Sequence, residues 1–446
     1  MMFNKEELTK VTGAELLKDS GKSLNYNIST DTRTIKSNDI YLPLKGANFD
    51  GEKFIDKALE SGAKAYFTTS DSVFDDAELV LKVENTLDAY LNIAKYYRNK
   101  INPITIAITG SAGKTTTKEL VYSVVSQKYK TQKTFSNHNN EIGFCQTVLG
   151  MDNDTQALIV EMGMRGLGEI ELISTHLEPD YAIITNCGSA HVGRLGSLDN
   201  IARAKCEITK GLKNNGILFA KNQERIKNFV GFNGEKIYYS LDDVKILEQT
   251  KSYSKFEYKN EVYELNVEGE YNIENSLSAI ELGQKLGLTK DEIKKGLYSY
   301  RPIEKRWEEE EIQGLKFIND SYNANPESVK ASVKTFVELY KNPVVVLGDM
   351  KELGGNEIEY HREVGRYLSK LNKNVKYLTV GNLAKEIGKE LENNGFEAHY
   401  FNSNKDASCY ILENLNKDNT IFLKASRSMQ FEEILDNIRR GICKLW

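Results

Sequence analysis

Residues 107–120 read AITGSAGKTTTKEL, which places two glycines, a lysine and three consecutive threonines after an apolar run. A strand, a glycine loop and a helix in this order suit a nucleotide triphosphate, because glycines let backbone N–H groups approach phosphate oxygens and the helix N-terminus adds positive potential. The loop has the short G-x-x-G-K-T form, with Ile108 where the general pattern has glycine. A glycine turn without a ligand is the alternative. The expected ATP-binding residues of this loop are Gly110, Ser111, Ala112, Gly113, Lys114, Thr115 and Thr116.

Apolar runs alternate with helical stretches on the C-terminal side of this loop. Strands are expected within residues 157–163, 181–186 and 216–220, and residues 267–287 are expected to lead from a strand into a closing helix. This alternation is typical of a parallel sheet covered on both faces. The sequence therefore predicts a central, doubly wound α/β domain over residues 101–302.

The flanking regions predict two further α/β domains. Residues 39–69 read as a strand, a helix and a returning strand, and residues 343–348, 376–381 and 420–425 read as strands that are each followed by a helix. The run RPIEKRWEEEE at residues 301–311 is dense in charge and marks a boundary. Three α/β domains are expected, at residues 1–100, 101–302 and 303–446, the last Rossmann-like.

The amino-acid composition limits the classes of partner that the chain is expected to bind. The 446 residues carry a formal net charge of -5, whereas a nucleic acid or an anionic membrane normally calls for a basic face. The N-terminus lacks the pattern of a signal peptide, and no segment reaches 18 uninterrupted apolar residues. We therefore expect a cytoplasmic protein with no nucleic-acid partner and no stable membrane insertion.

Two further candidate site residues follow the next expected strands. Glu161 ends one apolar run and His191 comes shortly after another, and ligands of doubly wound sheets bind at the carboxyl ends of the strands. A carboxylate and an imidazole there could hold a second magnesium ion, although His191 taken alone could equally be structural. Lys205, taken alone, reads as a solvent-facing lysine on a helix.

At this point several segments together resemble the Mur ligases, the ATP-dependent enzymes that form amide bonds in peptidoglycan synthesis. The C-terminal segments NDSYNANPESVKAS and VVVLGDMKELG are similar to those of members that add D-alanyl-D-alanine to a UDP-N-acetylmuramoyl-tripeptide. STDTR and LPLKGANFDGEKFIDKA in the N-terminal region resemble the UDP-binding domain of such members. The central segments that carry the resemblance are TGSAGKTTTKEL, TFSNHNNEIG, EMGMRGLGEI, NCGSAHVGRLGSLDNIARAKCEI and GEYNIENSLSAI.

The resemblance implies a mechanism. The carboxylate of the tripeptide would attack the γ-phosphate of ATP to form an acyl phosphate, and the amine of the dipeptide would then attack and form the amide through a tetrahedral intermediate. One domain would hold the UDP-linked peptide, one would hold ATP and Mg2+, and the third would close over the site with the dipeptide. The implied partners are these small molecules, and the chain is expected to be a monomer.

The resemblance also assigns roles to single residues. Lys114, Glu161, His191 and Lys205 would be catalytic; Thr115, Glu161, His191 and Lys205, as a carbamate, would hold the metal; Asn272, Asn275, Arg306 and Asp320 would contact ATP; and Asp31, Thr32, Arg33, Asn139, Asn140, Tyr322, Asn323 and Asn325 would contact substrates. A solvated charge run competes as the interpretation of Arg306, and a structural turn competes for the segment YNANP.

Three positions depart from the family pattern. Tyr271 stands where histidine is common, Glu52 where histidine is frequent in the UDP-binding domain, and Ala425 where glycine is expected beside the dipeptide pocket.

Two other functions remain open from the sequence. One is a related amide ligase with a different amine acceptor, such as a folylpolyglutamate-synthase-like enzyme, and the other is a nucleotide-binding regulator that catalyses no ligation.

Overall fold

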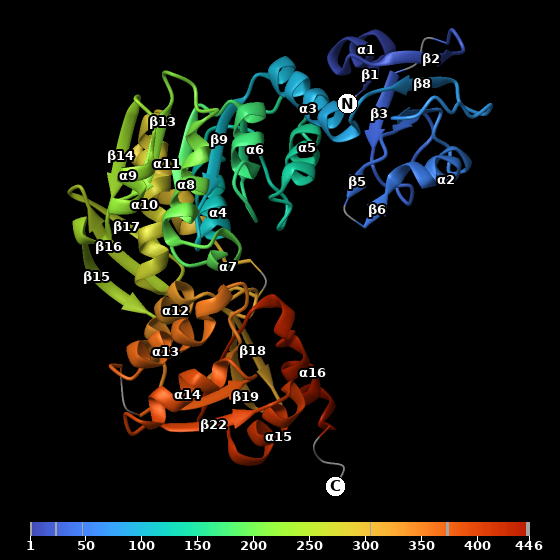
Figure 1. Cartoon of the computed structure of the whole chain (residues 1–446). Coiled ribbons are helices and arrows are strands. Elements are labelled where there is room, and N and C mark those ends of the chain that lie inside the picture. Colours follow the sequence, from blue (N-terminus) through green and yellow to red (C-terminus); the bar gives the residue numbers. More distant parts are fainter. Residues whose placement is uncertain (1, 23–24, 47, 304, 372–373, 443–446) are drawn as a thin grey trace.

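The chain forms three α/β domains, each built around its own six-stranded sheet. The structure is a computed structural model that describes residues 2–22, 25–46, 48–303, 305–371 and 374–442. In Figure 1 the N-terminal domain is blue, the central domain runs from cyan to yellow, and the C-terminal domain is orange and red. The two outer domains attach to different sides of the central domain. No helix in the described ranges is long and apolar enough to cross a membrane.

The central sheet is entirely parallel and has the order β10-β11-β9-β12-β13-β14. β9 lies between β11 and β12, so the strands that follow it in the chain are placed first on one side of it and then on the other. The carboxyl ends of these three strands therefore form the crevice of a doubly wound sheet. The strands are β9 (Ile104–Thr109), β10 (Thr131–Lys133), β11 (Ala157–Glu161), β12 (Tyr181–Ile184), β13 (Ile217–Lys221) and β14 (Glu235–Tyr239).

Helices cover both faces of this sheet, as the alternating buried residues require. Ile106 and Ile108 of β9 pack with α4 and α10 on one face, whereas Ala107 packs into the core of the opposite face. The prediction of a doubly wound α/β domain is confirmed. The helices are α4 (Lys114–Val125), α5 (Glu141–Leu149), α6 (Glu169–Leu177), α7 (Val192–Leu195), α8 (Leu198–Cys206), α9 (Glu224–Phe229), α10 (Glu270–Lys285) and α11 (Lys290–Ser299).

A three-stranded antiparallel sheet inside the central domain was not expected. It consists of β15 (Val244–Thr250), β16 (Tyr253–Tyr258) and β17 (Glu261–Leu265). Buried and partly exposed residues alternate along β16, so one face packs on the core while charged side chains face out. The strand expected within residues 267–287 is absent, because β17 ends at Leu265, but the expected helix is present as α10.

The N-terminal sheet has the order β1-β3-β4-β7-β8-β2, with parallel pairing from β3 to β8 and antiparallel strands at both edges. The predicted β-α-β unit is present as β4, α2 and β7. The elements are β1 (Phe3–Asn4), α1 (Lys5–Thr12), β2 (Glu15–Asp19), β3 (Asn25–Ser29), β4 (Asp39–Tyr41), β5 (Lys45–Gly46), β6 (Phe49–Asp50), α2 (Ile55–Glu60), β7 (Ala65–Thr68) and β8 (Leu79–Lys82).

The C-terminal sheet is parallel except at one edge, where β18 runs antiparallel to β19. The charged run that marked the boundary contains β18, whose acidic side chains suit an edge strand. The elements are β18 (Glu308–Ile312), β19 (Leu315–Asn319), α12 (Pro326–Leu339), β20 (Pro343–Gly348), α13 (Glu357–Leu368), β21 (Lys376–Val380), α14 (Ala384–Glu392), β22 (Glu397–Phe401), α15 (Asn404–Asn414), β23 (Thr420–Lys424) and α16 (Glu432–Arg440).

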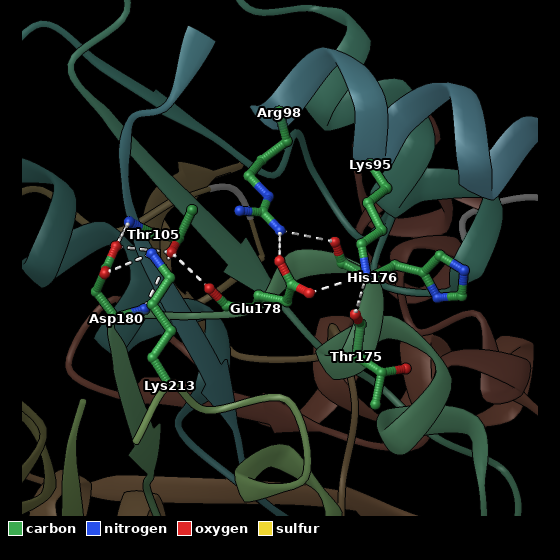
Figure 2. Close-up of polar contacts among 8 residues, drawn as sticks. All are labelled: Lys95, Arg98, Thr105, Thr175, His176, Glu178, Asp180 and Lys213. Carbon is green, nitrogen blue, oxygen red and sulfur yellow. Dashed lines mark hydrogen bonds and ion pairs between the residues drawn. The ribbon is translucent and has the colours of Figure 1, made fainter. Parts of the chain in front are cut away.

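Helix α3 (Thr86–Ile101) joins the N-terminal and central domains and packs against α1 on one side and α5 and α6 on the other. Figure 2 shows Arg98 and Lys95 of this helix pointing at Glu178, which follows α6. Arg98 pairs with Glu178, and Lys95 Nζ lies 2.9 Å from the same carboxylate. The Arg98 side chain is buried, so this ion pair anchors the helix to the central domain.

Candidate active site

The phosphate loop, residues 110–116, follows β9 and includes the first residues of α4, in the order of strand, loop and helix that the sequence predicted. Gly113 precedes the first residue of the helix with φ of 78°, and a Cβ atom there would lie 2.5 Å from Asn275 Oδ1. Only glycine fits both constraints. Lys114 Nζ donates to the carbonyl oxygen of Gly110 at 2.7 Å, and burial lowers the pKa of this lysine.

Asn186, which the sequence analysis did not single out, holds this loop in shape. Its Oδ1 accepts from the backbone N–H of Ala112 at 2.9 Å, and its Nδ2 donates to the carbonyl oxygen of Ala112 at 3.0 Å. Thr185 Oγ1 donates to the same carbonyl at 2.6 Å. A signal was present in the sequence, because both residues directly follow the apolar run of β12.

Glu161 ends β11 beside the phosphate loop, with only 2% of the residue exposed. Its Oε1 accepts from Asn139 Nδ2 at 2.9 Å and from Thr115 Oγ1 at 3.3 Å. Its buried Oε2 has no hydrogen-bond partner, and Lys118 Nζ lies 3.7 Å away. A buried carboxylate oxygen that no donor satisfies, next to a threonine hydroxyl, fits a hard cation such as Mg2+.

His191 directly precedes α7, and Lys205 lies near the end of α8. His191 has φ of 68°, and its Nδ1 lies 2.6 Å from Glu352 Oε2 in the C-terminal domain. Burial lowers the pKa of His191, Glu352 opposes that effect, and the charges of Lys114 and Lys205 add to the lowering. His191 therefore interacts electrostatically with both Lys114 and Lys205. In the described part of the chain, no group of three His, Cys, Asp or Glu residues is suited to hold a metal ion.

Lys205 is not the solvent-facing lysine that its sequence context alone indicated. Only 1% of the residue is exposed, and burial lowers its pKa to about 7, with a further contribution from Lys114. Desolvation disfavours the charged ammonium form, so a large fraction of this amine is neutral near pH 7. A neutral buried amine is chemically suited to react with carbon dioxide.

The C-terminal domain contacts the phosphate loop directly. Arg306 Nη2 donates to Thr115 Oγ1 at 3.1 Å, and its guanidinium lies 4.4 Å from the ring centre of Tyr322. This position rules out a solvated charge run as the interpretation of Arg306. Asn325 Nδ2 donates to the carbonyl oxygen of Ser111 at 3.4 Å, while its Oδ1 caps α12. The segment YNANP thus has a structural role and also reaches the site.

Two cavities meet at the phosphate loop. The first, of about 380 Å³, lies between the central and C-terminal domains and extends from Gly113 and Thr116 to Tyr271 and Trp307. The second, of about 640 Å³, lies beside Lys114. The predicted residues that line the second cavity but not the first are Ser111, Lys114, Thr115, Asn139, Asn140, Glu161, His191, Tyr322, Asn323 and Asn325. Both cavities are lined by Ala112, Gly113, Arg306, Asp320, Ser328 and Lys424.

Some predicted residues lie elsewhere. Asp31, Thr32 and Arg33 follow β3 in the N-terminal domain and line neither cavity. Arg33 pairs with Asp31 at 2.6 Å and lowers the pKa of that carboxyl group to about 2. Lys205 is buried and lines neither cavity. Asn272 lines the first cavity but donates through Nδ2 to the carbonyl oxygen of Glu268 at 2.7 Å.

The three residues that depart from the expected sequence pattern have different surroundings. Tyr271 lines the first cavity, whereas Glu52 accepts from the backbone N–H of Thr69 at 2.5 Å within the N-terminal domain. Ala425 is fully buried against Gly348 and lines neither cavity. Several residues of the second cavity were not predicted from the sequence, namely Asn137, His138, Arg165, Glu169, Glu352 and Arg427.

A phosphate loop that lies between closing α/β domains, next to a buried carboxylate and lysine, defines a class of ATP-using ligases, and comparison with known families agrees. The Mur ligase catalytic domain matches residues 25–99, the Mur ligase middle domain matches residues 108–283, and the Mur ligase glutamate ligase domain matches residues 305–427. The chain belongs to the Mur ligase family, as the motifs predicted.

Within this family the chain is similar to the UDP-N-acetylmuramoyl-tripeptide–D-alanyl-D-alanine ligases. It is 35% identical to that of Bacillus subtilis over 93% of both chains, and 30% identical to that of Haemophilus influenzae over 98% of both. The crystal structure of MurF from Acinetobacter baumannii matches it with a TM-score of 0.89 at 26% identity over 99% of both chains. The three-domain fold is confirmed.

Proposed function

We propose that this chain is an ATP-dependent ligase that joins D-alanyl-D-alanine to UDP-N-acetylmuramoyl-tripeptide, giving the pentapeptide, ADP and phosphate for peptidoglycan synthesis. The observation that carries this proposal is the meeting of two cavities at the phosphate loop. The first cavity suits a nucleotide whose phosphates rest on the loop. The second brings a carboxylate substrate and an amine substrate to the same phosphate, with walls from both the central and C-terminal domains.

The chemistry requires activation of a carboxylate, because a carboxylate is a poor electrophile. Transfer of the γ-phosphoryl group to the tripeptide carboxylate gives an acyl phosphate, from which phosphate leaves after the dipeptide amine attacks. Lys114 and Arg306 both lie at the phosphate loop and neutralise charge on the transferring group. Asn272 and Asn275 line the nucleotide cavity, and Asp320 lines both cavities beside Lys424.

We further propose that Thr115, Glu161, His191 and carbamylated Lys205 hold Mg2+. The buried Oε2 of Glu161, which accepts no hydrogen bond, supports this assignment. Addition of carbon dioxide to the neutral Lys205 amine forms an N–C bond, releases a proton and turns a potential cation into an anion. The metal would supply positive charge to the phosphates.

The substrate contacts are assigned by position. Asn139, Asn140, Tyr322, Asn323 and Asn325 line the second cavity and would bind the tripeptide end and the dipeptide. The turn of Asp31, Thr32 and Arg33 in the N-terminal domain would bind the UDP end. We keep the domain limits at residues 1–100, 101–302 and 303–446, because α3 ends at Ile101 and the strands of the third sheet begin at Glu308. A cytoplasmic monomer is proposed, since one chain supplies every element of the site.

The test is phosphate release by the purified chain with ATP, Mg2+ and the UDP-linked tripeptide, with and without D-alanyl-D-alanine, while mass spectrometry follows the product. Release that depends on both substrates, together with the pentapeptide mass, is the expected result. Tripeptide-dependent release with another amine would assign a different acceptor. Release that no amine affects would instead favour a nucleotide-binding regulator.

A further inference from the structure

Four carboxyl groups line the first cavity, and three of them have partners. The pairs are Glu274 with Lys221 at 2.7 Å, Asp320 with Lys424 at 2.5 Å, and Glu327 with Ser189 at 2.9 Å. The fourth is Glu268, of which only 3% is exposed. Across the described ranges, its carboxyl group makes no ion pair or hydrogen bond with another residue. A buried polar group of this kind is costly unless a ligand satisfies it.

Glu268 lies at the aromatic part of this cavity. Tyr271 and Trp307 line the same cavity with ring centres 6.4 Å apart, and Tyr300 lines it as well. The Tyr271 ring lies against Gly269, the residue after Glu268, and the charge of Glu268 contributes to the raised pKa values of Tyr271 and Tyr300, after burial as the main cause. Aromatic rings beside a hydrogen-bonding group are the surroundings that a nucleobase needs.

The amide side chains of the cavity are placed or engaged elsewhere. Asn275 lies against Gly113 of the phosphate loop, and Asn186 uses both amide atoms on Ala112. Asn272 commits its amino group to the backbone of Glu268. Glu268 is therefore the wall carboxyl group that remains available to a base whose phosphates occupy the loop.

We propose that Glu268 determines the nucleobase specificity of this chain by binding the amino group of adenine and an adjacent ring nitrogen. This inference rests on the proposed binding of ATP in the first cavity. The amino group of adenine is a donor beside an acceptor nitrogen, and a carboxylic acid offers a matching acceptor and donor. An ionised carboxylate lacks the donor, whereas guanine presents two adjacent donors that a carboxylate can accept. Adenine recognition thus requires a protonated carboxyl group.

The surroundings of Glu268 favour that protonated form. Burial raises the pKa of its carboxyl group to about 8, and the negative charge of Glu309 on β18 adds to the effect. The other titratable groups around it are the hydroxyl groups of Tyr271, Tyr300 and Tyr340. Tyr340 donates to Glu309 at 2.6 Å. A hydrogen bond from the backbone N–H of Glu268 to its own carboxyl group favours the carboxylate, and burial outweighs it.

The test is the binding of ADP and GDP to the full chain by calorimetry between pH 7 and pH 8.5, where both bases keep their protons, because GDP shares the phosphates and cancels effects at the metal end. For the unmodified chain, the ratio of the GDP to the ADP dissociation constant should fall about tenfold over this range as Glu268 ionises. Glu268→Gln keeps a donor and an acceptor, so it should bind ADP with unchanged affinity and remove the pH dependence. Glu268→Ala should weaken ADP binding about tenfold at pH 7.

The matched control is Glu270→Gln, since Glu270 lies two residues away, pairs with Lys334 and does not line the cavity. This variant should retain the pH dependence. The proposal is overturned if the ratio is constant with pH in the unmodified chain, if Glu268→Ala binds ADP normally, or if Glu270→Gln also removes the dependence. Binding needs no ligation, so a failed ligase assay with the expected binding profile would reject the proposed function alone.

Discussion

Lys114 is the side chain whose loss should affect the reaction most directly. In the structure its Nζ donates to the carbonyl oxygen of Gly110, so the cation already lies at the loop that would hold the phosphates. Hydrogen bonds to charged groups contribute about 1.5 to 3 kcal/mol, and about 1.4 kcal/mol corresponds to a factor of ten. Lys114→Ala should lower kcat/KM for phosphate release at least tenfold without changing the thermal unfolding midpoint by more than a few degrees. A loss below twofold would contradict this role.

Substitution of Lys205 should lower the ligase activity for a different reason, because the proposed role of this residue depends on a covalent modification. The full chain incubated with ¹³C-labelled bicarbonate should show a carbamate carbon in its NMR spectrum. Lys205→Ala should lose both that signal and at least nine-tenths of the ligase activity. Lys210→Ala, an exposed lysine on the next turn, should retain both. A carbamate signal that persists in Lys205→Ala would exclude this site of modification.

Among the larger elements, α3 carries the connection between the N-terminal and central domains. Burial raises the pKa of Glu178, but hydrogen bonds and attraction from Lys95 and Arg98 outweigh it and keep the pKa below its ordinary value. The stabilisation is therefore present above about pH 4.5 and is lost as the pH falls through the folded-state pKa. At neutral pH this contact joins two domains through one carboxylate (Figure 2).

Glu178→Ala should lower the free energy of unfolding in urea by about 1 to 3 kcal/mol at pH 7, because it leaves the buried Arg98 without its carboxylate. Glu178 itself is partly exposed, which keeps the figure below that of a fully buried pair. Arg98→Met should cost less, since Glu178 retains Lys95 and solvent. The opposite order of the two variants would show that packing of the Arg98 stem, not charge, governs this contact.

Several elements could be predicted from the sequence, and others could not. The run at residues 104–109 and the loop after it were predictable, because an unbroken buried strand and a phosphate loop are contiguous patterns. Strands β15 to β17 were missed because they are rich in charge: β16 and β17 are buried on one face only, and β15 has no buried residue. Strand β18 was read as a boundary for the same reason, since four of its five residues are glutamates.

At the level of the whole molecule, the C-terminal domain is docked on the central domain through backbone. Gly193 N donates to the carbonyl oxygen of Glu352 at 3.0 Å, and a Cβ atom on Gly193 would lie 2.4 Å from the backbone nitrogen of Gly354. Backbone atoms on both sides leave no flexible group to yield. This close approach holds His191 and Glu352 together across the interface.

Gly193→Ala should separate the two domains and lower the ligase activity at least tenfold, because displacements of about 1 Å at a reacting centre are costly. Small-angle scattering with an ATP analogue and the tripeptide should show a larger radius of gyration than the unmodified chain. Gly355→Ala is the matched control, since a Cβ atom there meets nothing within 4 Å. Equal activity and equal scattering for both variants would contradict a functional role for this contact.

The sequence by itself determined the α/β class, the phosphate loop and the family, because each depends on residues that are close together in the chain. Only the tertiary structure showed that Arg306 reaches Thr115, that Asn325 reaches Ser111 and that Glu268 lines the first cavity with no ion pair to another described residue. These residues come from different domains or follow unremarkable local patterns. Their environment arises from burial and from contacts across more than a hundred residues of chain, which no local pattern encodes.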